Sequence, residues 1–415
     1  MKKHLLLVFR ILVAVAGIGF ILTKVSITDQ VEVPAGSRLP GGHTLAQTTT
    51  FDVIWGVYDP AEPAGELIVQ IGTDGRGPQS MPIPQAALSL NGQDQKLLFV
   101  PGLIWMLRTA DVSMLLLGLL TVAAIYPVLT VRWWLLMRAR QIFVGLPKAF
   151  RLTMVGNFFN FCMPGTTGGD VVKAYYAAKG SGRRAEAVMS VVVDRVCGLL
   201  GLLLLAGVAG LFMLHNDVAR QLTIYTWLIG LGVVVAVAVY FSAFLRRVLA
   251  VGWFLGKLPA QRALTAIDQA AFAYRHHKRT VLGAIVISGA IHAALIVATS
   301  LAGYALGMQT PAGLLAVVIP LTFLVGALPV APPQGIGVME FFALVMLKPP
   351  WALPNQVFGM LILIRLYQLF YSLFGSLFLL KGDIHLHPQE DPGEANNSRK
   401  PINRSTATTT HAASP

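Results

Sequence analysis

The chain has 415 residues, of which 55% are apolar and only 12% are charged, and its formal net charge is +13. The charged fraction is about half of that in an ordinary soluble domain, so the composition excludes a soluble globular protein. We attribute the positive charge to the orientation of the chain in a membrane rather than to nucleic-acid binding, because basic residues in membrane proteins mark the loops that stay in the cytoplasm.

Long apolar runs dominate the chain. The first run, 11–28, is shorter than the five later runs named below and follows a basic start. We interpret 1–28 as an uncleaved membrane anchor. A cleaved signal peptide is the alternative, but Arg10 interrupts the apolar stretch and no small-x-small site precedes Thr28. A spanning helix needs roughly 20 apolar residues. Five runs meet this requirement: 112–131, 186–214, 222–244, 280–307 and 355–380.

The loops differ in charge, and this difference predicts the topology. Residues 138–184 contain eight bases against Asp170 alone, and residues 245–279 contain seven bases against Asp268 alone. Residues 25–109 contain eight acids against four bases. The first two segments are therefore expected in the cytoplasm and the third outside. Six crossings then place both termini in the cytoplasm, and we expect the protein in the cell inner (cytoplasmic) membrane.

The segment 29–109 is predicted to be a small, β-rich, extracytoplasmic insert. Its stretches 48–58 and 66–72 are rich in β-branched and aromatic residues, and Pro, Gly and Asp punctuate them. The remaining chain divides into a transmembrane domain, 110–382, and a polar tail, 383–415. The tail is rich in Pro, Asn, Ser and Thr, so we expect it to be disordered and cytoplasmic.

Two apolar segments, 147–179 and 312–347, are broken near their middles. Each has an apolar arm, a Pro/Gly break and a short second arm headed by an acid, Asp170 or Glu340. We expect two re-entrant hairpins that enter from opposite faces, which is typical of an inverted repeat; pairs of tight full crossings are the alternative. The predicted fold is thus an all-α polytopic membrane protein. The break residues are expected to permit a tight backbone rather than to touch substrate; they are Pro164, Gly165, Gly168, Gly169, Pro333, Gly335 and Gly337.

Charged side chains within the apolar segments are the candidate functional residues, because a charge in hydrocarbon is costly. They are Asp170, Asp194, Arg195, Glu340 and Arg365. An arginine matches the oxygens of a lipid phosphate, a helix N-terminus favours an anion, and an acid can take up a proton or hold a cationic headgroup. The structural alternative is that the acids cap short helices and that the charges pair with one another.

Three motifs occur in a fixed order along the membrane segments. They are Asn157-x-x-Asn160-x-x-x-Pro164-Gly165-x-x-Gly168-Gly169-Asp170-x-x-Lys173, then Asp194-Arg195-x-x-Gly198, then Pro333-x-Gly335-x-Gly337-x-x-Glu340. This series, with Arg132-Trp133 before it, resembles the lysylphosphatidylglycerol synthase transmembrane (flippase-like) family over roughly 112–380. The resemblance implies an integral membrane protein that binds or moves phospholipids or polyprenyl-linked lipids, and it adds Asn160 and Lys173 to the expected headgroup-binding residues. Lys173 stands where arginine is commoner in the family, and the insert 29–109 is larger than the family's usual first loop.

The expected function is therefore that of a lipid translocase or lipid-binding transporter, with no catalytic residue, metal or cofactor. The sequence offers no Walker-type loop and no metal-spaced His/Asp cluster. The stretch after the last helix is too short for the aminoacyl-transferase domain of the full synthases, so we do not expect the chain to aminoacylate lipid. Two alternatives are an enzyme that uses the buried acids on lipid headgroups, and an accessory subunit whose insert recruits an envelope-assembly partner.

Overall fold

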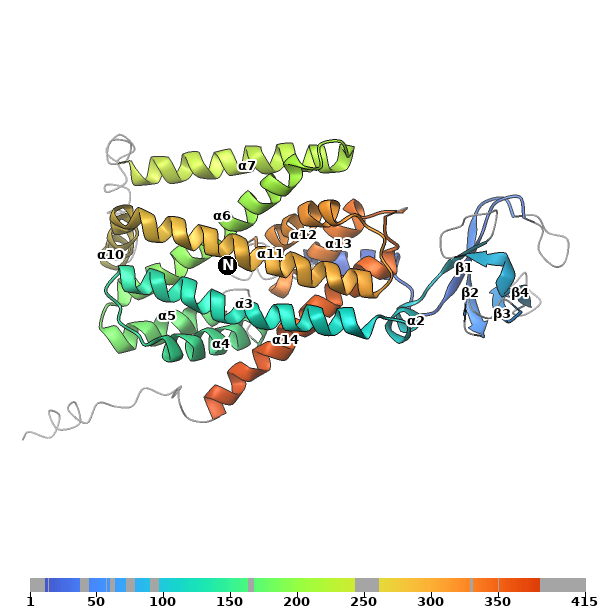
Figure 1. Cartoon of the computed structure of the whole chain (residues 1–415), viewed down its shortest axis with the longest axis horizontal. Helices are drawn as coiled ribbons and strands as arrows, with labels where there is room; N and C mark the ends of the chain where they lie inside the picture. Colours follow the sequence, from blue (N-terminus) through green and yellow to red (C-terminus); the bar gives the residue numbers. More distant parts are fainter. Residues whose placement is uncertain are drawn as a thin grey trace, which may run out of the picture.

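The computed structural model describes residues 12–13, 15–37, 45–56, 58–59, 64–71, 79–89, 97–162, 168–242, 261–328, 331–349 and 351–380. These residues form a helical body and a β-sheet that lies at one end of its long axis (Figure 1). The short helix α2 (Leu103–Arg108) joins the sheet to the body, and α10 (Gln261–Phe272) lies at the opposite end. The tail predicted at 383–415 lies outside the described residues.

Five helices of the body are long and apolar enough to cross a membrane. A helix of 27 residues, such as the last of these, is about 40 Å long, whereas the hydrocarbon core is about 30 Å thick. The five long apolar runs are thus confirmed as helices of a polytopic membrane protein. The five are α3 (Val112–Ala139), α6 (Arg184–Leu211), α7 (Asp217–Phe241), α11 (Lys278–Ala305) and α14 (Pro354–Leu380).

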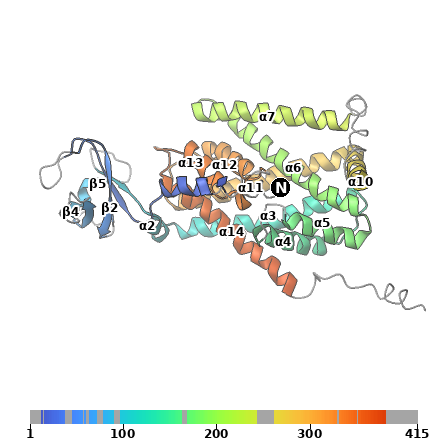
Figure 2. The ribbon, with the colours of Figure 1, turned by 180° about the vertical axis from the view of Figure 1, so that it is seen from behind.

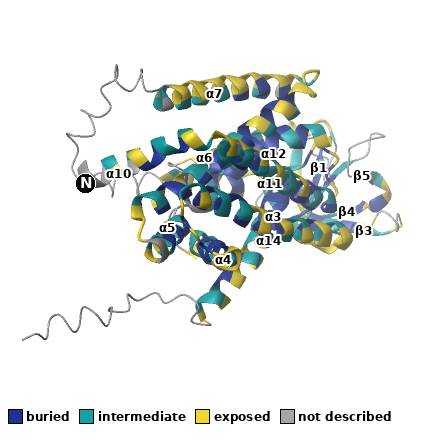
Figure 3. Cartoon of the chain, turned by 60° about the vertical axis from the view of Figure 1, so that its left-hand side comes forward, coloured by how far each residue is buried: buried dark blue, intermediate teal, exposed yellow. Residues whose placement is uncertain are grey.

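The first of these helices is longer than its apolar run. The apolar run ends at 131, directly before the charged Arg132, but α3 continues to Ala139. Arg132 is 5% exposed and has charged and polar partners inside the body, so the charge does not end the helix. Helix α7, by contrast, presents most of its apolar side chains outward (Figure 3), as a helix that faces lipid does.

Two pairs of shorter helices correspond to the broken segments. The pair α4 (Leu146–Cys162) and α5 (Gly168–Ser181) lies in the half of the body away from the sheet, whereas α12 (Ala312–Gly326) and α13 (Val338–Met346) lie in the half near it (Figure 1). With nine residues, α13 is only about 14 Å long, which is less than half of the hydrocarbon core.

Each pair begins and ends at the same end of the body. The Arg183 Nη1 donates to the Arg140 carbonyl at 3.4 Å, which joins the two ends of the first segment. The Gln356 Nε2 donates to the Leu306 carbonyl at 3.1 Å, which does the same for the second segment. The chain therefore turns back within each segment.

The described part of the first apolar run is helical over 12–13 and 15–22. Figure 2 shows this helix beside α12 and α13, where the rings of Phe20 and Phe341 lie 4.9 Å apart in an edge-to-face arrangement. Gly17 packs against the Gly337 backbone so closely that a Cβ there would lie 2.6 Å from the Gly337 Cα. Residues 1–11 lie outside the described range, so a sixth crossing stays a prediction.

The sheet has six strands in the order β4-β3-β2-β1-β6-β5. Neighbouring strands are antiparallel except β5 and β6, and Val31 pairs with Phe51 between β1 and β2. Val31, Leu67 and Phe99 are fully buried in its small core, and β2 and β3 coincide with the two stretches predicted from β-branched content. The strands are β1 (Gln30–Val33), β2 (Thr49–Trp55), β3 (Glu66–Ile71), β4 (Gln79–Pro84), β5 (Leu88–Ser89) and β6 (Leu97–Val100).

Candidate functional site

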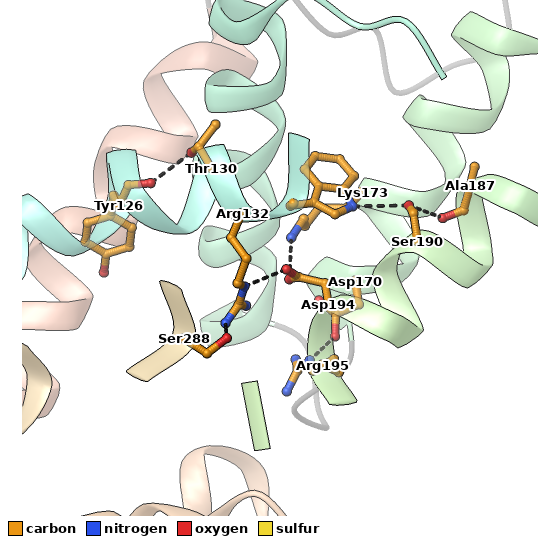
Figure 4. Close-up of polar contacts among 11 residues, drawn as sticks. Tyr126, Thr130, Arg132, Asp170, Lys173, Ala187, Ser190, Asp194, Arg195 and Ser288 are labelled. Carbon is orange, nitrogen blue, oxygen red and sulfur yellow. Dashed lines mark hydrogen bonds and ion pairs between the residues drawn. The ribbon is translucent and has the colours of Figure 1, made fainter. Parts of the chain in front are cut away.

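The first charged cluster is centred on Asp194, which α6 places inside the body. The Arg132 Nε of α3 donates to Asp194 Oδ1 at 2.8 Å, and the Arg132 Nη1 donates to Ser288 Oγ of α11 at 2.7 Å (Figure 4). The side chains of Arg132 and Asp194 are 6% and 7% exposed. Burying either charge without the other would be strongly destabilising. With Ser288, the pair joins three spanning helices.

Lys173 enters this cluster from α5. Its Nζ lies 3.8 Å from Asp194 Oδ2 and 4.3 Å from the centroid of the Trp133 ring, over which it sits (Figure 4). Lys173 can reach this position because Gly156 of α4 has no side chain: a Cβ there would lie 2.7 Å from the Lys173 Cγ. Asp194 therefore faces two cations from two different helices.

The neighbouring residue of α6, Arg195, points elsewhere and pairs with Asp170. The Arg195 Nε donates to Asp170 Oδ2 at 2.5 Å, and the two side chains are 40% and 16% exposed (Figure 4). Asp170 stands in the first turn of α5, where an acid is also favoured by the helix dipole. This pair is therefore more accessible than the one at Asp194.

The second cluster lies beside α13, where Glu340 pairs with Arg365 of α14. Glu340 is 1% exposed, and its Oε2 also accepts the Gly337 backbone N–H at 2.8 Å. The Nη2 of Arg365 approaches the Gln334 carbonyl at 3.4 Å, while its buried Nε has no hydrogen-bond partner among the described residues. Glu340 thus both caps a helix and neutralises an arginine.

A hydrogen bond joins the two clusters. The Gln334 Nε2, in the break before α13, donates to the carbonyl of Asn160 near the end of α4 at 2.8 Å. The Asn160 side chain is used locally, because its Oδ1 accepts the Gly169 N–H at the start of α5 at 2.9 Å. The end of α4 and the break before α13 therefore touch inside the body.

Comparison with known proteins identifies the family of the chain. The family model of the lysylphosphatidylglycerol synthase TM region matches residues 99–375, well over half of the chain. The chain belongs to this family. The resemblance read from its motifs is confirmed, and the family and the apolar helices together identify a multi-pass membrane protein with a lipid-related function. No curated protein and no solved structure matches the chain.

The structure places six of the seven residues expected to bind the headgroup in these two clusters, and the seventh, Asn160, links the clusters through its backbone carbonyl. Sequence reasoning missed three partners: Arg132 as a member of the site, Ser288 and Gln334. Arg132 had a signal, since Arg132-Trp133 is part of the family pattern, whereas a serine or glutamine in an apolar segment carries no comparable signal.

The glycines of the two breaks have different roles. Gly168 and Gly169 are the first residues of α5, so their assignment to the break was wrong; Gly169 instead allows close helix packing, because a Cβ there would lie 1.6 Å from the Gly156 carbonyl oxygen. Gly335 and Gly337 have φ values of 64° and 85°, which few other residues adopt. Pro333 begins the short turn before α13, while Pro164 and Gly165 lie outside the described residues.

The clusters carry an excess of positive charge. The first contains Arg132, Lys173 and Arg195 against Asp170 and Asp194, and in the second Glu340 balances its arginine. The described members therefore leave one positive charge. An uncompensated charge within a membrane is costly, so the arrangement favours an anionic ligand.

Proposed function

We propose that this family member is a lipid translocase or lipid-binding transporter that moves a phosphate-bearing lipid, a phospholipid or a polyprenyl-linked lipid, across the inner membrane. The observation that supports this most is the pair of arginine–carboxylate contacts at the touching turns of two broken helix pairs, with one cation in excess. On this proposal the headgroup is carried rather than chemically altered.

We propose further that the two broken pairs are re-entrant hairpins related as an inverted repeat. Each pair starts and ends at one end of the body, and the two lie in opposite halves of it. The sheet would then lie outside and α10 in the cytoplasm with both termini, in keeping with the basic segments 138–184 and 245–279. Broken helices that meet at mid-membrane are where secondary transporters bind substrate.

Exchange of arginine partners would provide the binding step. Arg195 and Arg365 each have a carboxylate partner now, and a phosphate offers the same bidentate geometry to a guanidinium. A phosphate that enters would take over the arginine from Asp170 or Glu340. The carboxylate would then displace the phosphate as the headgroup leaves, so the acids are needed for release as well as for stability.

The test is a proteoliposome assay with fluorescent anionic phospholipids and with a polyprenyl phosphate. Wild type should translocate at least one of them, and Asp170→Asn and Glu340→Gln should abolish translocation while the purified variants stay monodisperse. Asp217→Asn is the matched control, because Asp217 is 81% exposed and pairs only with the exposed Arg220 in the described structure. Unchanged translocation by both site variants, or none by well-folded wild type with every phosphate lipid, would overturn the proposal.

A further inference from the structure

A cavity of about 660 Å³ lies between α2 and the sheet-proximal ends of α11 and α14. Its wall combines residues from the end of β6, from α2, from the turn after α11 and from the segment before α14. This volume falls within the range of roughly 300–1,000 Å³ that is common for small-molecule sites. The cavity is separate from the charged clusters, because none of the residues of those clusters lines it.

Aromatic and polar residues line this cavity. Three aromatic residues, Trp105, Tyr304 and Trp351, contribute to the wall together with the amide of Gln309 and the carboxylate of Asp111. Asp111 caps α3 through Oδ1, which accepts the N–H groups of Ser113 and Met114, so its second oxygen is available for a ligand hydroxyl. The lining residues in the described chain include neither lysine nor arginine.

Hydrogen bonds hold two of the aromatic side chains and the backbone of the third. The Trp105 Nε1 donates to the Tyr58 carbonyl at 2.9 Å, and the Tyr304 hydroxyl donates to the Thr310 carbonyl at 3.0 Å. The Thr310 hydroxyl in turn donates to the Trp351 carbonyl at 2.8 Å. The wall is therefore preorganised, which lowers the entropic cost of binding a ligand.

We propose that this cavity is a binding site for a saccharide, either free or as a lipid headgroup. Aromatic faces contact the C–H faces of a sugar ring, while an amide donates to and accepts from its hydroxyls and a carboxylate accepts from them. An anion is disfavoured because the wall offers a carboxylate and no base.

The test uses native mass spectrometry of the full-length protein with defined lipids. Monoglucosyl diacylglycerol should bind in preference to phosphatidylglycerol and phosphatidylethanolamine, and methyl glucoside in solution should compete if the sugar alone is recognised. Trp351→Ala should weaken binding about five- to tenfold, because an aromatic contact contributes about 1 kcal/mol and 1.4 kcal/mol is tenfold. Trp351→Phe should keep most of the binding, which separates ring loss from misfolding.

Ile104→Ala provides the matched control, since Ile104 lies on the same short helix as Trp105, is 50% exposed and does not line the cavity. Its sugar binding should equal that of wild type. Preference for phosphatidylethanolamine or phosphatidylglycerol over the glycolipid would overturn the proposal, and so would glycolipid binding that Trp351→Ala and Ile104→Ala reduce equally. The outcome does not depend on whether the protein transports lipid.

Discussion

Replacing Glu340 with glutamine should destabilise the protein far more than replacing Asp170 with asparagine. Glutamine can still accept the Gly337 N–H, so the main loss is the charge opposite Arg365, whose side chain is 14% exposed. Removing one partner of a buried ion pair costs about 3–5 kcal/mol. The Asp170–Arg195 pair includes a guanidinium that is 40% exposed, and solvent screening limits its contribution to about 1 kcal/mol or less.

The assay is reversible unfolding in mixed micelles, followed by tryptophan fluorescence at a fixed lipid-to-detergent ratio. A double variant, Glu340→Gln with Arg365→Met, should recover at least half of the loss, because it also removes the arginine that Glu340→Gln alone leaves buried without a countercharge. The double-mutant cycle then isolates the coupling between the two residues. Equal costs for Glu340→Gln and Asp170→Asn, or strict additivity in the double variant, would refute the assignment of a buried, mutually dependent pair.

Two further predictions concern packing and pH. Gly169→Ala should prevent α4 and α5 from packing and sharply lower folded yield, since its Cβ would collide with the Gly156 backbone; Gly230→Ala, with open space around it, should be neutral in the same size-exclusion measurement. Burial raises the pKa of Asp29 above its ordinary value of 3.8, although the Gly102 N–H donates to it at 2.7 Å. Because the folded pKa is the higher one, the sheet should lose stability as the pH rises through that pKa. Asp29→Asn, which keeps an oxygen acceptor, should flatten this dependence in limited proteolysis; a steeper dependence would contradict it.

The sequence was sufficient for the features that depend on local composition. Apolar runs long enough to cross the hydrocarbon core predicted five helices, because a single spanning segment can satisfy its own backbone groups only as a helix. β-branched stretches predicted β2 and β3, and the spacing of Asn, Gly, Asp and Pro identified the family. The cost of a charge in hydrocarbon also singled out Asp170, Asp194, Arg195, Glu340 and Arg365, and all five form ion pairs in the structure.

Partnership between these residues was decided only by the tertiary structure. Asp194 and Arg195 are adjacent in the chain, yet successive positions of a helix point about 100° apart, so one joins Arg132 and Lys173 while the other meets Asp170. The bond from Gln334 to Asn160 links residues far apart in the chain, and no local pattern encodes such a distance. The sequence therefore shows which residues in the membrane segments are charged. The packing of the helices determines which of these residues pair and that one cation is left in excess.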